Sequence, residues 1–239
     1  LDPAAVALAL AAFLIFCALS GAVYLFNDVF DRAADRQHPL KSQRPIASGA
    51  LSVGAALAWA AGLMVGGLVV AFWLQPPFGW AAAAYVALQV AYTCWLKHLV
   101  ILDVMAIAMG FVLRAVAGGL VIGVTVSDWL LACTILLALF LGLSKRRHEL
   151  TLLTDGASEH RRILEEYDPY LLDQMIAVVA ASTLVAYIIY CLSSETTERF
   201  GTDWLVLTVP FPIYGIFRYL YIVHRKDGGG TPSAMLLNA

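Results

Sequence analysis

Long apolar stretches recur along the whole chain and decide what it can fold into. Hydrophobic residues make up 61% of the 239 residues and charged residues 13%, about half the charged fraction of an ordinary soluble domain. Seven stretches are apolar enough to cross a bilayer as helices, which takes roughly 18–25 residues. They are approximately Pro3–Phe26, Gly49–Leu74, Phe78–Leu96, Leu99–Ile122, Trp129–Leu143, Leu172–Leu192 and Trp204–Val223, of which the fifth is short and is expected to run on into Ser144. The pattern predicts an all-α, polytopic transmembrane helical bundle.

The connections between these stretches alternate in charge. Twelve of the fifteen Lys and Arg residues fall in one alternate set, and the connections 75–77 and 123–128 of the other set carry none. Because cytoplasmic loops of membrane proteins carry the excess of Lys and Arg, the cation-rich set is expected in the cytoplasm. Segments 27–48 and 145–171 then form the two long cytoplasmic cap loops.

The first of these loops follows an apolar stretch and reads YLFNDVFDRAADRQHPLKSQRPIASG over Tyr24 to Gly49. Asp28, Asp31 and Asp35 stand at i, i+3 and i+7, so a helix would place all three carboxylates on one face. Clustered carboxylates repel one another unless a cation lies between them, and oxygen ligands of this kind suit Mg²⁺ bridging to a substrate phosphate. Lys41 and Arg44 follow and are suited to bind the remaining phosphate oxygens.

A solvated, charged loop is the simpler alternative for this segment. Such a loop, however, does not require three acids on one face beside a membrane. The sequence therefore favours a metal site here.

Two further charges, Asp103 and Arg114, lie in the fourth apolar stretch rather than in a loop. They are eleven residues apart, about three helical turns, and so share a face. A charge inside a membrane is costly and usually faces a cavity or a partner. A functional role is favoured over a snorkelling or structurally paired Arg114.

The second long loop opens on the basic cluster Lys145-Arg146-Arg147. On a helix, Lys145 and Glu149 are i, i+4 neighbours and are expected to pair. Such a cluster is often only an orientation signal or a contact to anionic lipid. The alternative is that this loop and the acidic loop form one cap, with metal ligands from one and phosphate ligands from the other.

Taken together, these motifs resemble a known family. NDVFDRAAD matches the NDxxDxxxD motif of the UbiA superfamily of intramembrane prenyltransferases, and RQHPLKSQRPIASG continues that pattern. LKHLVILDVMAIAMGFVLRAVAGG and the KR-x-x-E-L stretch at Lys145–Leu150 are similar to the phosphoribosyl-transferring branch. Most aromatic prenyltransferases carry an acidic DxxxD motif in that second loop. Here Asp155 and Glu159 have that spacing outside the expected setting.

The resemblance implies nine transmembrane helices around a central cavity. Residues 1–239 would then be a single UbiA-like domain that supplies the second to eighth helices and is truncated at both ends. The implied location is the bacterial cytoplasmic membrane, with the active-site loops facing the cytoplasm.

The resemblance also implies a reaction: transfer of 5-phosphoribose from phosphoribosyl pyrophosphate to a polyprenyl (decaprenyl) phosphate, with release of pyrophosphate, for cell-wall arabinan precursors. Asp28, Asp31 and Asp35 would be catalytic and, with Asn27, would hold Mg²⁺. The expected substrate-binding residues are Asn27, Lys41, Arg44, Lys97, Asp103, Arg114, Lys145, Arg146 and Glu149.

Two other functions stay open. A UbiA-type aromatic prenyltransferase, such as a 4-hydroxybenzoate polyprenyltransferase, shares the first motif, but its second loop should be acidic. A membrane transporter would use Arg114 to line a path, although no discontinuous repeat is apparent in the two halves. No nucleic-acid partner is expected, and homo-oligomerisation is left open.

Overall fold

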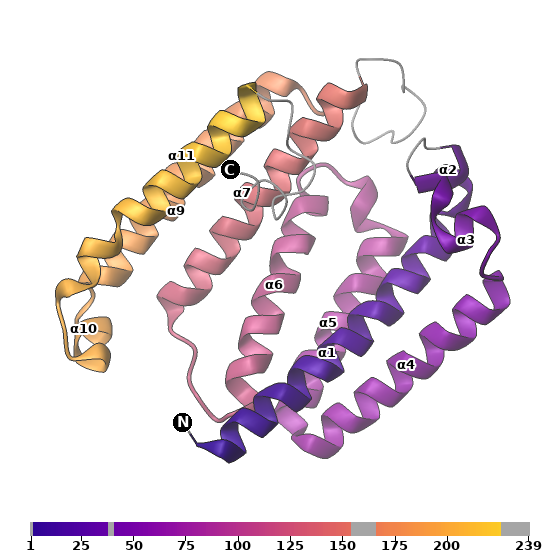
Figure 1. Ribbon diagram of the computed structural model, residues 1–239, viewed down its shortest axis with the longest axis horizontal. Helices are drawn as coiled ribbons and strands as arrows, with labels where there is room; N and C mark the ends of the chain where they lie inside the picture. Colours follow the sequence, from indigo (N-terminus) through magenta and orange to yellow (C-terminus); the bar gives the residue numbers. More distant parts are fainter. Residues whose placement is uncertain (1, 38–40, 154–165, 226–239) are drawn as a thin grey trace. The chain divides into compact units, whose positions relative to one another are not determined.

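The computed structural model describes residues 2–37, 41–153 and 166–225, and within these ranges the chain forms α- and 3-10 helices and no strand (Figure 1). Six helical stretches in the described ranges are long and apolar enough to cross a membrane. They are α1 (Pro3–Phe30), α4 (Val53–Leu74), α6 (Leu102–Val121), α7 (Asp128–Leu153), α9 (Pro169–Leu192) and the stretch Trp204–Val223. The predicted all-α transmembrane class is confirmed.

The predicted number of seven spanning helices is not confirmed. The third predicted stretch, Phe78–Leu96, does form a helix, α5 (Pro76–Cys94), but these 19 residues are not among the six apolar stretches. Two prolines occupy its first turn, where their missing N–H groups are tolerated, and Gln89 and Thr93 interrupt its apolar character. Polar side chains inside α5 thus lower its hydropathy, and one of them, Thr93, bonds Asn27 at the end of α1.

Two helices extend beyond their apolar stretches, and both extensions carry candidate site residues. Helix α1 runs four residues past the predicted end at Phe26, so Asn27 and Asp28 lie on its last turn. Helix α7 runs ten residues past Leu143 and carries the basic cluster at 145–147. The basic cluster is therefore placed by a helix rather than by an irregular loop. Asp155, Glu159 and the rest of 154–165 lie outside the described residues.

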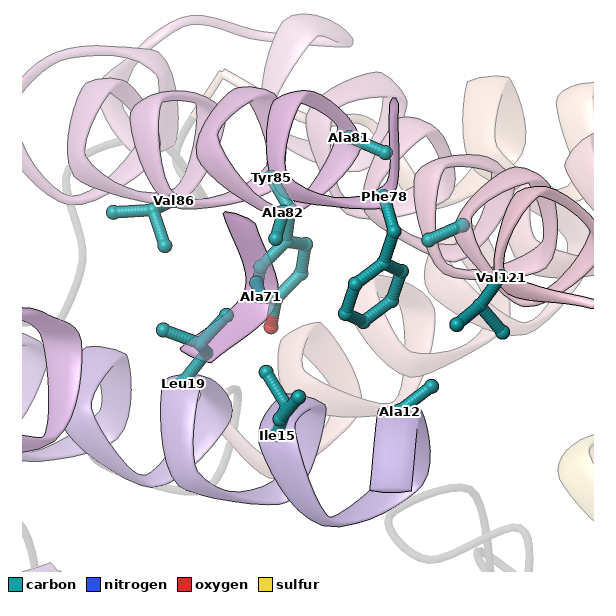
Figure 2. Close-up of a cluster of buried hydrophobic side chains, with 11 residues drawn as sticks. Ala12, Ile15, Leu19, Ala71, Phe78, Ala81, Ala82, Tyr85, Val86 and Val121 are labelled. Carbon is teal, nitrogen blue, oxygen red and sulfur yellow. The ribbon is translucent and has the colours of Figure 1, made fainter. Parts of the chain in front are cut away.

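The chain divides into two compact units. Unit 1 is Leu1–Leu99 with Val112–Val126, and unit 2 is Val100–Phe111 with Ser127–Ala239. In unit 1, α1, α4 and α5 pack on one another (Figure 1). Their shared core includes Leu19, Phe78 and Tyr85, and Tyr85 projects from α5 toward α1 (Figure 2).

Short elements connect the long helices of unit 1 at the end that carries the acidic motif. They are α2 (Arg32–Gln37), η1 (Lys41–Gln43), α3 (Pro45–Ser48) and η2 (Leu96–His98). Gly49 ends α3 with a φ of 87°, a left-handed conformation that glycine adopts without strain. Ser52 then caps the N-terminus of α4 through its side chain. The acidic segment is thus a compact folded turn.

In unit 2, α7 and α9 pack along each other, and α11 (Pro210–Arg225) packs on α9. The core there includes Val104, Phe140, Leu172 and Ile176. Helix α10 (Ser194–Phe200) and η3 (Trp204–Thr208) connect α9 to α11. The last spanning stretch is broken at Pro210, because proline has no N–H to continue the preceding turn. Trp204 is highly exposed, as is typical of the aromatic belt at a membrane surface.

Candidate active site

The three motif aspartates lie where α1 gives way to α2. Asp28 is on the last turn of α1, Asp31 caps the end of that helix, and Asp35 is in α2. The N–H of Asp31 donates to the Asn27 carbonyl at 2.9 Å, and the N–H of Asp35 donates to the Asp31 carbonyl at 2.8 Å. Although the helix is interrupted at Asp31, its bonding continues across the break. The i, i+3, i+7 relation that the sequence predicted is therefore largely kept.

One arginine joins two of these acids. Nη1 of Arg44 lies 2.8 Å from Oδ1 of Asp28 and 2.9 Å from Oδ2 of Asp35. Arg44 immediately precedes α3, which is tied back to α2 where Arg36 donates to the Ala47 carbonyl at 3.0 Å. The fold thus brings together Asp28 and Asp35, seven residues apart, at a single cationic nitrogen.

The third acid, Asp31, turns to the end of α5 instead. Nζ of Lys97 is 2.6 Å from its Oδ1, and Nδ2 of Asn27 donates to its Oδ2 at 3.0 Å. The Thr93 hydroxyl donates to Oδ1 of Asn27 at 3.3 Å. Lys97 is buried although it is charged, which Asp31 offsets. Six of the sequence-predicted site residues therefore gather here: Asn27, Asp28, Asp31, Asp35, Arg44 and Lys97.

The donor atoms of this cluster fit Mg²⁺. Three carboxylates and an amide oxygen are the hard oxygen ligands that this ion takes. In the described part of the chain, no three Asp, Glu, His or Cys side chains converge as they would around a bound ion. Two of the three aspartates do converge on one point, the Arg44 nitrogen. The residues present suit the metal. In this structure the negative charge of the three aspartates is balanced by Arg44 and Lys97, and a bound Mg²⁺ would balance the same charge.

Lys41 begins η1 and is half-buried beside this cluster's connecting turn. It is a candidate phosphate ligand by position in the loop. That role stays a prediction.

Asp103, in unit 2, is completely buried and fully bonded. Nε of Arg146 donates to its Oδ2 at 2.7 Å, and the Tyr167 hydroxyl donates to its Oδ1 at 2.8 Å. Arg146 is itself only 4% exposed, and its Nη1 donates to Glu149 at 2.6 Å. We call Asp103, Arg146, Tyr167 and Glu149 the buried clasp. It joins α6, α7 and the segment that leads into α9.

The expected Lys145–Glu149 pair is not formed. Glu149 binds Arg146 instead, because the buried Asp103 holds Arg146 on the inner side of α7. Lys145 is exposed. Arg147 pairs with Asp173 at the start of α9 through two nitrogen–oxygen contacts, the Nη2 to Oδ2 contact at 3.3 Å. Three adjacent cations on one helix thus have three different environments.

Tyr167 also supports a strained residue. Ile101 has a φ of 70°, which costs a β-branched residue roughly 1–3 kcal/mol. Its N–H donates to the Tyr167 oxygen at 2.7 Å. Burial raises the pKa of Tyr167 to about 12, and the adjacent Asp103 carboxylate adds to the effect. Tyr167 therefore stays protonated and keeps both hydrogen bonds at neutral pH.

Arg114 lies apart from the acids, in the part of α6 that belongs to unit 1. Its guanidinium stands over the ring of Tyr85, 5.1 Å from the centroid, and its Nη2 donates to the Tyr85 hydroxyl at 3.4 Å. Sequence reasoning singled out Arg114 but missed Tyr85. The signal was the spacing of Tyr85, Gln89 and Thr93, since polar residues four apart line one face of a helix. Tyr167 had no such signal, because only tertiary packing brings it to Asp103.

Known proteins resemble this chain over nearly its full length. The model of the UbiA prenyltransferase family matches residues 2–239. The decaprenyl-phosphate phosphoribosyltransferase of Mycolicibacterium smegmatis is 34% identical over 235 residues, covering 95% of this chain and 73% of that protein. The protein of the same name from Corynebacterium glutamicum is 34% identical over 229 residues, covering 94% and 68%.

A solved structure shares the fold. The UbiA homolog from Archaeoglobus fulgidus bound to GPP and Mg²⁺ matches with a TM-score of 0.78 at 19% sequence identity, covering 97% of this chain and 82% of that chain. The full-length match to the family model, the two relatives and this fold agree. The chain belongs to the UbiA prenyltransferase family.

Proposed function

We propose that this chain is a Mg²⁺-dependent transferase of the bacterial cytoplasmic membrane. It moves 5-phosphoribose from phosphoribosyl pyrophosphate to a polyprenyl phosphate and releases pyrophosphate, as a step toward cell-wall arabinan precursors. Family membership supports a transferase. The names of the relatives from M. smegmatis and C. glutamicum support the phosphoribosyl donor and the lipid phosphate acceptor.

The observation that carries this proposal is the cluster of Asp28, Asp31 and Asp35 with Arg44 and Lys97. Asn27 and the three aspartates would hold Mg²⁺, which would neutralise the charge of the leaving pyrophosphate. Arg44 and Lys97 have charged groups at the same place and would bind phosphate oxygens. The Mg²⁺ in the A. fulgidus structure is consistent with a metal in this family.

In this reaction a phosphate oxygen of the lipid forms a bond to ribose C1, and the bond from C1 to pyrophosphate breaks. The attacking oxygen is already anionic, so no residue has to remove a proton. Positive charge develops on the ribose ring as the pyrophosphate leaves. A carboxylate of Asp31 or Asp35 beside that ring would stabilise it.

The basic residues of α7 divide between two roles in this proposal. Lys145 is exposed and would bind a phosphate of the donor. Arg146 is held in the buried clasp by Asp103 and Glu149. Its role is therefore to position α7 and, with it, Lys145.

Asp28→Asn tests the proposed function. In full-length protein purified in lipid nanodiscs, we expect phosphoribosyl transfer to polyprenyl phosphate to fall about 100-fold or more, since a metal supplies several kcal/mol of charge stabilisation. Asp203→Asn removes an exposed acid near η3 and is the matched control, with no expected loss. Normal turnover by Asp28→Asn at ordinary Mg²⁺ would contradict the proposal.

An aromatic prenyltransferase is the second candidate, favoured by the GPP in the A. fulgidus structure. The same preparation offered a polyprenyl diphosphate with 4-hydroxybenzoate separates the two. We expect no product from that pair. Product there, with none from phosphoribosyl pyrophosphate, would assign the second function instead.

The proposed orientation places the acidic turn in the cytoplasm. The turn belongs to the cation-rich set of connections, and cytoplasmic loops carry the excess of Lys and Arg. Ser42 is the labelling position for a test of this orientation, because it lies in η1 beside the acidic turn. In a background without the native cysteines, Ser42→Cys should react with a membrane-impermeant reagent only after cell lysis. Labelling in intact cells would reverse the orientation.

A further inference from the structure

Polar side chains form a line along the facing sides of α1 and α5 within unit 1. It begins at the acidic cluster, where the Thr93 hydroxyl bonds Asn27. Further along, the hydroxyls of Ser20 and Tyr85 lie 3.1 Å apart. Ser20 and Asn27 are seven residues apart, two helical turns or about 10 Å. Hydrogen-bonding groups thus continue from the cluster into an otherwise apolar interior.

At its inner end, this line is organised by Tyr85. Nε2 of Gln89 and Nη2 of Arg114 both donate to the Tyr85 hydroxyl oxygen, at 3.3 and 3.4 Å. A phenol oxygen has two acceptor positions and one hydrogen, so Tyr85 must donate its hydrogen to Ser20. The Tyr85 side chain is 1% exposed and fixed between α5 and α1 (Figure 2). An edge contact with Phe16 at 5.3 Å adds to this constraint.

Tyr85 orients Arg114 through two contacts. The hydroxyl and the ring face are the two parts of Tyr85 that meet the guanidinium, and neither carries a net charge. A charged residue in a membrane helix is costly, usually faces the bundle interior or a water-filled cavity, and is a candidate functional residue. A guanidinium is planar, weakly hydrated and able to donate two parallel hydrogen bonds to a phosphate. The arrangement is that of an oriented anion-binding group.

We propose that Arg114, oriented by Tyr85 and assisted by Gln89, binds a phosphate monoester within unit 1. This assignment rests on the proposed function and gives it a second phosphate subsite, separate from the acidic cluster. The two helical turns between Asn27 and Ser20, about 10 Å, suit a sugar ring with a phosphate group on either side. Both the lipid phosphate and the 5-phosphate of the donor are monoesters, so either can fill the subsite.

Binding measurements test the subsite without turnover. Farnesyl phosphate, a short prenyl phosphate monoester, and phosphoribosyl pyrophosphate would be titrated separately into protein in nanodiscs, with farnesol as the uncharged reference. A charge-assisted hydrogen bond is worth about 1.5–3 kcal/mol, so Arg114→Gln should weaken the binding of one of the two phosphate ligands about 10- to 100-fold. Arg114→Lys should recover part of the affinity for that ligand. Gln89→Leu is a second test that removes a neutral polar side chain, and it should weaken the binding of the same ligand.

Arg218→Gln is the matched control. Arg218 also lies in a membrane helix and over a tyrosine ring, 5.8 Å from the centroid of Tyr221, but it belongs to unit 2. Neither affinity should change in this variant. Losses of similar size in Arg218→Gln and Arg114→Gln would mean that any membrane arginine has this effect, and would overturn the proposal.

The two ligands identify the source of the phosphate. Weaker farnesyl phosphate binding with unchanged farnesol binding assigns the lipid phosphate, and weaker phosphoribosyl pyrophosphate binding assigns the sugar 5-phosphate. Unchanged affinities for both in a folded Arg114→Gln overturn the subsite, as does a wild type that binds neither. A wild type that binds farnesyl phosphate through Arg114 but transfers no phosphoribose keeps the subsite and removes only the proposed function.

Discussion

The two units use the same chemistry, a carboxylate paired with a guanidinium, in opposite environments. Arg44 in unit 1 has a side chain that is 39% exposed, and it contacts Asp28, 24% exposed, and Asp35, 7% exposed, two acids that a metal would also use. Asp103 and Arg146 in unit 2 are 0% and 4% exposed, and every carboxylate oxygen has a donor. Exposed pairs contribute little to stability, whereas breaking a buried pair leaves an uncompensated charge. The first arrangement can exchange partners and the second cannot.

Replacing each arginine tests this contrast most directly. Arg146→Ala should lower the free energy of unfolding by about 3–5 kcal/mol, because it leaves Asp103 charged and buried. Arg44→Ala should lower it by less, because the Arg44 side chain is itself 39% exposed, although Asp35, 7% exposed, loses a donor. Reversible denaturant unfolding in mixed micelles measures both values under one condition. Equal losses would mean that the two pairs do not differ in kind.

Donor affinity should depend on the two arginines in the opposite order to stability, once the affinity is measured on folded molecules only. Among folded molecules, Arg44→Ala should weaken binding of phosphoribosyl pyrophosphate about 10- to 100-fold, the value of one charge-assisted contact. Arg146→Lys keeps a charge near Asp103 and should retain most of the donor affinity. A donor affinity that depends on Arg146 but not on Arg44 would make the clasp the phosphate site and the acidic turn the structural element.

Sequence patterns predicted unit 1 better than unit 2, and the reason is the distance between partners along the chain. The acids of unit 1 lie within one short motif, so spacing alone predicted their common face. Lys97 and Thr93 lie about 66 residues from Asp31 and Asn27, yet Lys97 was selected through its resemblance motif. Thr93 was not selected, although its four-residue spacing from Gln89 and Tyr85 places it on their face of α5.

The clasp shows what local patterns miss. Spacing on α7 predicted Lys145 with Glu149, but the observed partner of Glu149 is Arg146. The position of Arg146 depends on Asp103, which is 43 residues from Arg146 in the sequence. Asp103 in turn is bonded by Tyr167, which is 64 residues from Asp103. Helical periodicity identifies which residues are neighbours on one helix. It does not identify which face of that helix a second helix will cover.

Close packing beside the clasp provides a smaller test. A Cβ added at Gly142 of α7 would lie 2.7 Å from Cγ1 of Val104, and Val104 is a buried core residue next to Asp103. Overpacking of this kind typically costs about 1–3 kcal/mol, so Gly142→Ala should lower unfolding stability by that amount. Gly215→Ala in α11 of the same unit meets nothing within 4 Å and is the control. No loss in Gly142→Ala would show that α6 and α7 shift easily there, which a rigid clasp would not allow.

The last expected effect is a pH dependence carried by Tyr167 alone. In the folded protein burial raises the pKa of Tyr167 to about 12, whereas an unfolded chain has a tyrosine pKa near 10. Above pH 10 the unfolded state therefore binds fewer protons than the folded state, and stability must fall as pH rises. The contribution is fully present below pH 10 and is lost between about pH 10 and 12.

Tyr167→Phe isolates the pH-dependent contribution of Tyr167 to folding stability. The substitution removes the hydrogen bonds to Asp103 and Ile101, and we expect it to cost about 1–3 kcal/mol at neutral pH. The stability difference between wild type and Tyr167→Phe should stay constant from pH 7 to 9.5 and then shrink toward pH 12, because only the wild type loses the proton-linked contribution. A Tyr170→Phe variant, which removes an exposed tyrosine of the same unit, controls for general effects of alkali. A difference that stays constant to pH 12 would mean that Tyr167 ionises no later in the folded chain than in the unfolded one, and that the clasp does not hold its proton.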